Sequence, residues 1–136
     1  MPSIFTRIIA GEIPGQFVFK DALWTAMLDI APAAPGHVLL VPCAEAQHLA
    51  ELPAATISAL GDRLARLTAT VKRATGAPAV NVLINDGPAA GQAVPHVHLH
   101  IIPRFPGDRV HTHPKGGAYE EGGLARWADD LRKAWR

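Results

Sequence analysis

The sequence HVHLHII at residues 96–102 places a histidine at every second position of an otherwise apolar run. Side chains alternate between the two faces of a β-strand. The run therefore predicts a strand over residues 97–102, in which three imidazoles share one face while Val97, Leu99 and Ile101 enter the core. Neighbouring imidazoles would start about 7 Å apart, and the outer two about 13 Å apart, from a rise of about 3.3 Å per residue.

The segments around this strand predict an α+β fold. Further strands are predicted from short apolar runs at residues 17–20, 24–29, 37–41 and 80–85. Helices are predicted at residues 3–11, 54–75 and 121–136, the second from a long apolar stripe between Pro53 and Gly76. Because alternating strand–helix units are absent, we expect an antiparallel sheet of about five strands with one long helix and short terminal helices, packed on one side.

The composition is that of a globular protein: 49% of the 136 residues are apolar and 18% are charged. We expect a single domain over residues 1–136. No apolar run approaches the ~20 residues of a membrane span, and the first residues lack a signal-peptide pattern. The formal charge of +1 gives no footprint for nucleic acid. With Cys43 as the only cysteine, these features favour a cytoplasmic protein that binds neither nucleic acid nor membranes.

Three kinds of site could use the histidine row. Two imidazoles at alternate strand positions can share a zinc ion, with further ligands from His37, His48, His111 or His113, but three in a line cannot easily converge on one ion. A structural row would need a hydrogen-bond partner for every ring. A catalytic row explains all three histidines together, because a neutral imidazole is a competent nucleophile toward phosphorus near pH 7.

The loop NDGPAAGQAVP at residues 85–95 leads directly into the histidines. Gly91 lets the backbone approach a ligand closely, so that nearby N–H groups could hold phosphate oxygens. Asn85 and Gln92 add neutral side-chain donors. The loop therefore favours a phosphate site beside the histidines.

These residues resemble the histidine triad (HIT) family, whose signature is His-x-His-x-His followed by two apolar residues. The similarity extends over residues 3–104 and includes Ile4-Phe5 and IAGEIP at residues 9–14, preceded by Ile8. It also includes residues 29–32 and 34–39 with Pro42, GPAAGQ at residues 87–92, and Pro103-Arg104. The resemblance implies an antiparallel sheet with helices. It also implies a homodimer in which two sheets join edge to edge.

The resemblance also implies roles for single residues. His98 corresponds to the nucleophile that becomes nucleotidylated, and His100 and His37 to contacts of the α-phosphate. His96 corresponds to a partner that orients the site and aids the leaving group. Asp29 occupies the position that binds the ribose hydroxyls, which a carboxylate can accept.

Two further sets of residues follow from the same resemblance. Contacts to phosphate and sugar are implied for the stretch that contains Asn85, Gly91, Gln92, Ala93 and Val94. An apolar slot for the base is implied for Ile4, Phe5, Ile8, Ile13 and Met27, although ordinary core packing explains those five equally well.

The chain departs from the family pattern at three places. Ser3 and Thr6 stand where many bacterial members have a zinc-binding cysteine pair, and Glu45 stands where a histidine ligand is common, so no metal or other cofactor is expected. Ala93 replaces a serine or threonine that can donate to the leaving group or phosphate. His100 is retained where the transferase branch has glutamine, which favours a hydrolase.

The expected function is hydrolysis at the α-phosphate of nucleoside phosphoramidates or dinucleoside polyphosphates, through a covalent nucleotidyl-histidine at His98. The expected ligand is a purine nucleotide or a nucleotide conjugate. The alternative is a nucleotide-binding adaptor with little turnover. His111 and His113 are interpreted as part of a solvated loop, and Trp135 as packing for the last helix.

Overall fold

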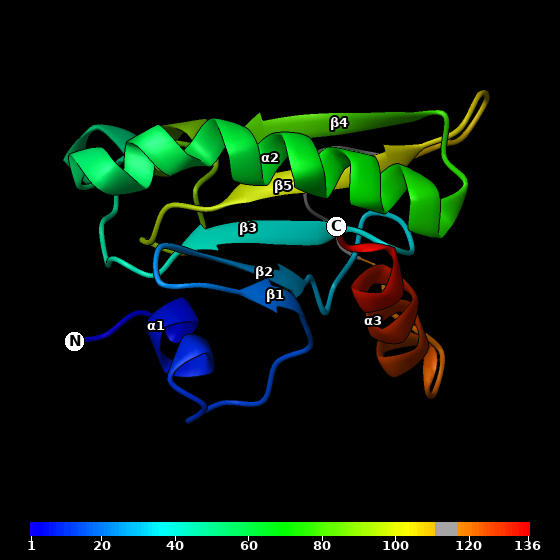
Figure 1. Cartoon of the computed structure of the whole chain (residues 1–136), viewed down its shortest axis with the longest axis horizontal. Coiled ribbons are helices and arrows are strands. Elements are labelled where there is room, and N and C mark those ends of the chain that lie inside the picture. Colours follow the sequence, from blue (N-terminus) through cyan, green and yellow to red (C-terminus); the bar gives the residue numbers. More distant parts are fainter. Residues whose placement is uncertain (111–116) are drawn as a thin grey trace.

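The computed structural model describes residues 1–110 and 117–136 and contains a five-stranded antiparallel sheet (Figure 1). The strands lie in the order β1-β2-β3-β5-β4, and each pairs antiparallel with its neighbours. Their bounds are β1 Phe17–Lys20, β2 Trp24–Leu28, β3 Val38–Pro42, β4 Ala79–Ile84 and β5 Leu99–Arg104. The predicted α+β class and the predicted number of strands are confirmed for the described residues.

Helix α2, Ala54–Thr75, crosses one face of the sheet (Figure 1). It follows Pro53 and ends at Gly76, whose φ of 74° is a left-handed conformation that glycine adopts without a steric penalty. Its buried Leu67 and Val71 join the main apolar cluster between the helix and the sheet. The predicted bounds of this helix are confirmed, and its apolar stripe supplies the core of the monomer.

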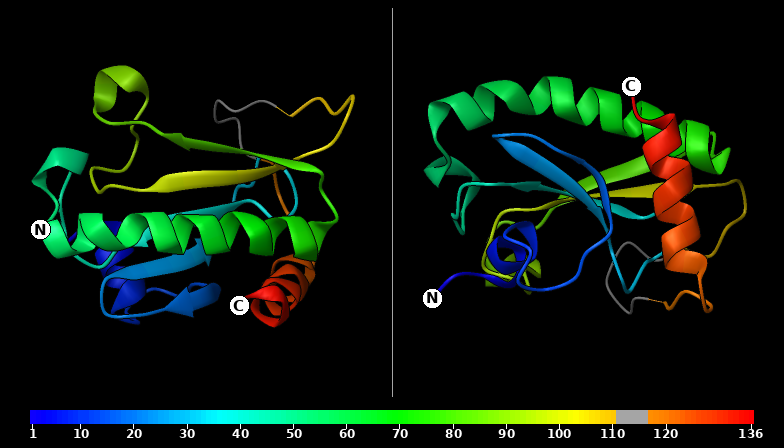
Figure 2. Two further views of the ribbon diagram at one scale, coloured as in Figure 1. Left: turned by 45° about the horizontal axis from the view of Figure 1, so that its top comes forward. Right: turned by 60° about the horizontal axis from the view of Figure 1, so that its bottom comes forward.

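Helix α1, Ile4–Ile9, covers the opposite face of the sheet (Figure 2, right). Phe5 is buried there in a second cluster with Met27, Leu39 and Val41. The expectation that all helices lie on one side is therefore wrong. The reason is visible in β2 and β3, where every residue is buried, because both faces of the central strands carry apolar side chains that need cover.

Helix α3, Gly123–Ala134, packs against α2 and β1. Trp135 follows it and stacks on Phe19, with ring centroids 4.0 Å apart, while the Arg66 guanidinium lies over the Trp135 ring. The prediction that this tryptophan packs the last helix is confirmed. None of the described helices combines the length and apolarity that a membrane crossing requires. His111 and His113 lie outside the described residues.

Strand β5 begins at Leu99, two residues later than predicted. Before it, the His96 N–H donates to the Val94 carbonyl oxygen at 2.8 Å, and the Val97 N–H donates to Ala46 at 2.8 Å instead of to a neighbouring strand. The segment that carries His96 and His98 is therefore irregular. Val97, Leu99 and Ile101 nevertheless enter the core beneath α2, as the alternation predicts.

Candidate active site

A cavity of about 440 Å³ opens on the α1 side of the sheet, a size typical of small-ligand sites. His37, directly before β3, lines it together with His98 and His100. Most of the remaining lining is apolar, and it comes from α1 and the loop after it, from β2 and the segment after it, from β3 and β5, and from the loop that precedes His96. The cavity thus combines a row of imidazoles with an apolar slot.

All but two of the residues predicted for the site line this cavity. Those that do are Ile4, Phe5, Ile8, Ile13, Met27, Asp29, His37, Asn85, Gly91, Ala93, Val94, His98 and His100. The sequence analysis missed Pro14, Gly15, Leu28, Ile30, Ala31, Ala33, Leu39 and Ile102. Leu39 and Ile102 lie two positions beyond His37 and His100, so the period of a β-strand contained the signal that could have found them.

His98 is held in one tautomer by the backbone. Its Nδ1–H donates to the carbonyl oxygen of His96 at 2.7 Å, which leaves a lone pair on Nε2. The ring is 8% exposed and meets the edge of Phe5, with ring centroids 4.9 Å apart. Burial lowers the pKa of His98 below its usual value, which favours the neutral ring that a nucleophile requires.

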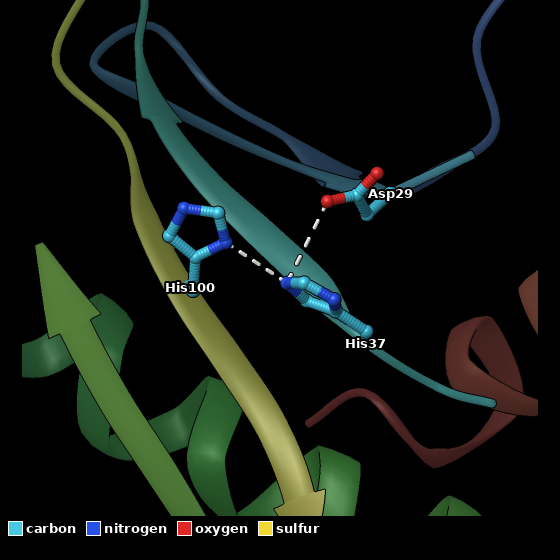
Figure 3. A group of neighbouring side chains, drawn as sticks. All are labelled: Asp29, His37 and His100. Carbon is cyan, nitrogen blue, oxygen red and sulfur yellow. Dashed lines mark hydrogen bonds and ion pairs between the residues drawn. The ribbon is translucent and has the colours of Figure 1, made fainter. Parts of the chain in front are cut away.

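His37 and His100 form a chain of hydrogen bonds that also fixes their tautomers (Figure 3). The Ala33 N–H donates to His37 Nδ1 at 2.9 Å, so a neutral His37 carries its proton on Nε2. That Nε2 lies 3.0 Å from His100 Nδ1 and donates to it. The proton of a neutral His100 is consequently on Nε2, where it can donate to a ligand.

Burial keeps both of these imidazoles neutral. Burial, with a smaller contribution from His98, lowers the pKa of His37 to about 4. Burial, followed by the neighbouring His37 and His98, also lowers the pKa of His100 to about 4. At neutral pH both rings are therefore uncharged, and the Nε2–H of His100 is the one proton of this pair that can be donated to a ligand.

Asp29 follows β2 and lies beside this chain, with Oδ2 3.7 Å from His37 Nε2 (Figure 3). Its Oδ1 accepts the Ala31 N–H at 2.9 Å. Burial raises the pKa of Asp29, and the Ala31 N–H offsets part of that rise. The carboxylate is thus partly desolvated at the edge of the cavity, where it can accept hydroxyl donors from a ligand.

Asp29, His37 and His100 are also the group of described residues whose ligand atoms lie close enough, within 4.8 Å of one another, to hold a metal ion. The Ala33 N–H opposes that use. A metal on His37 Nε2 would force the ring proton onto Nδ1, where it would face the Ala33 donor. The donor set therefore fits a hydrogen-bonded chain better than a metal centre.

The Gln92 side chain forms hydrogen bonds with the backbone and does not line the cavity. Its Oε1 accepts the Gly87 N–H at 2.8 Å, and its Nε2 donates to the Gln47 carbonyl oxygen at 2.9 Å. Both ends of this 7%-exposed amide are thus engaged, so the structure does not support a phosphate contact from it. Gly91, with a φ of 95°, and Asn85 remain at the cavity from the same loop.

His96 is fully buried and is the other predicted residue that does not line the cavity. Its Nε2 lies 2.9 Å from the Pro42 carbonyl oxygen and its Nδ1 lies 2.6 Å from Ser3 Oγ. The structure therefore supports an orienting role for His96. It does not support proton donation to a leaving group, because both ring nitrogens are engaged elsewhere.

Comparison with known proteins assigns the chain and its fold to one family. A family model described as the HIT domain matches residues 10–107. The chain belongs to the HIT family. The assignment made from the sequence motif is thereby confirmed.

Three similar proteins illustrate the range of this HIT protein's relatives. An adenosine 5′-monophosphoramidase of Schizosaccharomyces pombe is 40% identical over 104 residues, which cover 76% of this chain and 75% of that protein. An adenylylsulfatase of Arabidopsis thaliana is 36% identical over 101 residues, 74% of this chain and 51% of that protein. The crystal structure of a Hit-like protein from Bartonella henselae matches with a TM-score of 0.85 at 31% identity, covering 97% of this chain and 95% of that one.

The HIT cavity is short of fixed positive charge. Among the described residues that line it, none is lysine or arginine, and the three imidazoles all have a lowered pKa. A phosphate group would therefore be held by N–H donors in a partly dry site, where hydrogen bonds are stronger than in water.

The neutral histidines predict how stability depends on pH. Between about pH 6.5 and pH 4 the unfolded chain binds protons that folded His37 and His100, with pKa values of about 4, do not bind. The free energy of unfolding should fall on acidification across this window, by up to about 1.4 kcal/mol per pH unit for each proton. Denaturant unfolding at several pH values measures the slope. The double variant His37→Gln, His100→Gln should flatten it, and an unchanged slope in that variant contradicts the assignment.

Proposed function

We propose that this HIT protein is a nucleotide hydrolase that attacks the α-phosphorus of its substrate through Nε2 of His98. The observation that carries the proposal is the 2.7 Å hydrogen bond from His98 Nδ1 to the His96 carbonyl oxygen, since it leaves Nε2 of a neutral, cavity-lining ring as a nucleophile. The relatives named as a monophosphoramidase and an adenylylsulfatase support the same class of reaction.

The proposed reaction has two displacements. In the first, the Nε2 lone pair forms a bond to the α-phosphorus while the bond to the leaving group breaks and its electron pair departs with that group. The ring becomes a nucleotidyl-imidazolium, whose Nδ1–H stays on the His96 carbonyl oxygen. In the second, water forms a bond to phosphorus, the P–N bond breaks, its electron pair returns to Nε2, and the proton of water is released. The product is a nucleoside monophosphate.

The other residues of the cavity would hold the substrate. The Nε2–H of His100 donates to an α-phosphate oxygen, and His37 supports that donor from behind. Asp29 accepts the ribose hydroxyls at the cavity edge. The apolar slot formed by Phe5, Ile8 and Met27 takes the base, for which a purine offers the larger apolar surface.

Replacing the nucleophile tests the proposal. His98→Ala should lower kcat by about 10⁴-fold or more, as loss of a covalent nucleophile does elsewhere. Nucleotide affinity should change little, because the apolar slot and Asp29 remain. Steady-state hydrolysis and calorimetric titration with a nucleoside monophosphate measure the two quantities. A wild type that binds nucleotide without turnover supports the adaptor alternative, and a His98→Ala variant that keeps its turnover rules out this nucleophile.

The two residues for which the family resemblance implies contact with the leaving group, Ala93 and His96, bear on the choice of substrate. An amine leaves phosphorus only when it is protonated, whereas a phosphate leaves as a stable anion. The side chain of Ala93 has no proton to donate, and both ring nitrogens of His96 are engaged. We therefore infer that, of the two expected classes, dinucleoside polyphosphates suit the described residues better than phosphoramidates.

A hydroxyl at position 93 tests this preference. Ala93→Ser should raise kcat for a nucleoside phosphoramidate by about tenfold, the effect of one hydrogen bond worth about 1.4 kcal/mol in the transition state. The same change should leave hydrolysis of a dinucleoside tetraphosphate within about twofold. The measurement is the ratio of kcat/KM for the two substrates in both proteins. An equal change for both substrates contradicts the preference.

We also propose that two copies of this chain associate through the outer edge of the sheet. Strand β4 is the last strand on its side, and Val82 in it is 42% exposed. Ile57 of α2 is another large apolar side chain at the surface, 40% exposed. Pairing of two β4 strands would satisfy the free edge and extend the sheet.

The proposed pairing of two β4 strands predicts that a charged side chain on β4 separates the two copies. Wild type should sediment as a dimer, and Val82→Arg should sediment as a monomer, because like charges would meet across the joined strands. Phe105→Arg is the matched control, since Phe105 is 47% exposed but does not lie on β4. A monomeric wild type, or a dimeric Val82→Arg, overturns this arrangement.

A further inference from the structure

A cluster of polar side chains joins the amino-terminal segment to the histidine strand. Ser3 and Thr6, which occupy the family's cysteine positions, meet Glu45 and His96 there. This donor set does not fit a structural zinc ion, which takes thiolate sulfur, imidazole nitrogen and carboxylate oxygen in a closed tetrahedron. Two of the four groups are neutral hydroxyls, and the other two already accept hydrogen bonds from them.

Glu45 and His96 both accept hydrogen bonds from the Ser3–Thr6 segment. Glu45 Oε1 accepts the backbone N–H of Ser3 and the hydroxyl of Thr6, the latter at 2.8 Å. These two donors lower the pKa of Glu45. The His96 Nε2–H donates to the Pro42 carbonyl oxygen, so Nδ1 is an acceptor, and the Ser3 hydroxyl donates to it at 2.6 Å.

Ser3 also holds the start of helix α1, whose Ile4, Phe5 and Ile8 line the cavity. Its Oγ accepts the Thr6 N–H at 3.1 Å and so caps helix α1. That helix presents Phe5, whose ring contacts both His96 and His98, with ring centroids 5.7 and 4.9 Å apart. The Ser3 hydroxyl group therefore contacts both the start of helix α1 and the His96 ring.

The hydrogen bonds that hold the His96 ring also affect the orientation of His98. Its ring is held at both nitrogens, by Ser3 and by Pro42, so its backbone has little freedom to turn. The carbonyl oxygen of the same residue accepts the His98 Nδ1–H. The orientation of the nucleophile thus depends on a path of three hydrogen bonded residues that begins at the amino terminus.

We propose that Ser3 is a positioning residue that takes the place of a structural metal, holding His96 so that its carbonyl oxygen keeps His98 in the reactive tautomer. This inference rests on the proposed hydrolysis at His98, but its structural part concerns ring protonation and can be measured without turnover. Thr6 and Glu45 complete the metal-free cluster by fixing the backbone of Ser3.

The test compares Ser3→Ala, Ser3→Thr and the control Ser58→Ala, which removes an exposed serine of α2. Nitrogen-15 spectra of the histidine rings at neutral pH report the tautomers. In Ser3→Ala the His96 Nδ1 resonance should move and His98 should become a mixture of tautomers, with kcat about tenfold lower. Ser3→Thr keeps the hydroxyl and should restore the wild-type tautomer and most of the rate. Ser58→Ala should match wild type.

Several results would overturn the proposal. A Ser3→Ala variant that keeps a single His98 tautomer removes the positioning role, whatever its rate. If Ser3→Ala does not fold, Glu45→Gln serves as the second variant, because it weakens the same cluster and leaves the hydrogen bonds of His96 in place. It should move the nitrogen-15 resonances of His96 and His98 in the same direction, but by less. Unchanged resonances in Glu45→Gln count against the proposal. One zinc ion per wild-type chain, lost in Glu45→Gln, shows a metal site instead. If the tautomers respond as expected but no substrate is hydrolysed, the proposed function fails while the positioning role stands.

Discussion

The hydrogen bond from His98 Nδ1–H to the carbonyl oxygen of His96 is the constraint on which the rest of the site depends. In a regular strand the carbonyl groups lie in the plane of the sheet and bond to neighbouring strands. Here the chain is irregular until Leu99, where β5 begins, so the His96 carbonyl is free to meet the ring two residues later. The late start of β5 therefore makes the tautomer of His98 a property of the backbone.

Burial explains the second property of the site, which is that its histidines are neutral. His37 and His100 lie within hydrogen-bond distance of each other and near His98, so protonating one of them would place a charge in a poorly solvated cavity, and protonating two would place like charges side by side. The site avoids this by arranging one chain of donors from the Ala33 N–H through His37 to His100. A nucleotide phosphate would meet oriented N–H groups that need no reorganisation as charge develops in the transition state.

The sequence allowed much of this architecture to be predicted. The α2 bounds followed from a stripe with clear end signals, and most cavity residues followed from the family resemblance. The failures concern side chains whose partners are distant in sequence. Gln92 bonds to Gln47 and His96 bonds to Pro42 and Ser3, and no local pattern encodes those contacts. The helix at residues 3–11 was predicted, but it was placed on the wrong face of the sheet, although β2 and β3, apolar except for Thr25, indicated that both faces need cover.

The central claim is that the reaction passes through a covalent bond between His98 and the α-phosphorus. The most direct measurement is the stereochemistry at phosphorus, using a dinucleoside polyphosphate with one chiral phosphorothioate at the α position, hydrolysed in oxygen-18 water. Each in-line displacement inverts the configuration. Two displacements through the His98 adduct therefore predict net retention in the nucleoside monophosphorothioate product, and net inversion would contradict the account by showing direct attack of water.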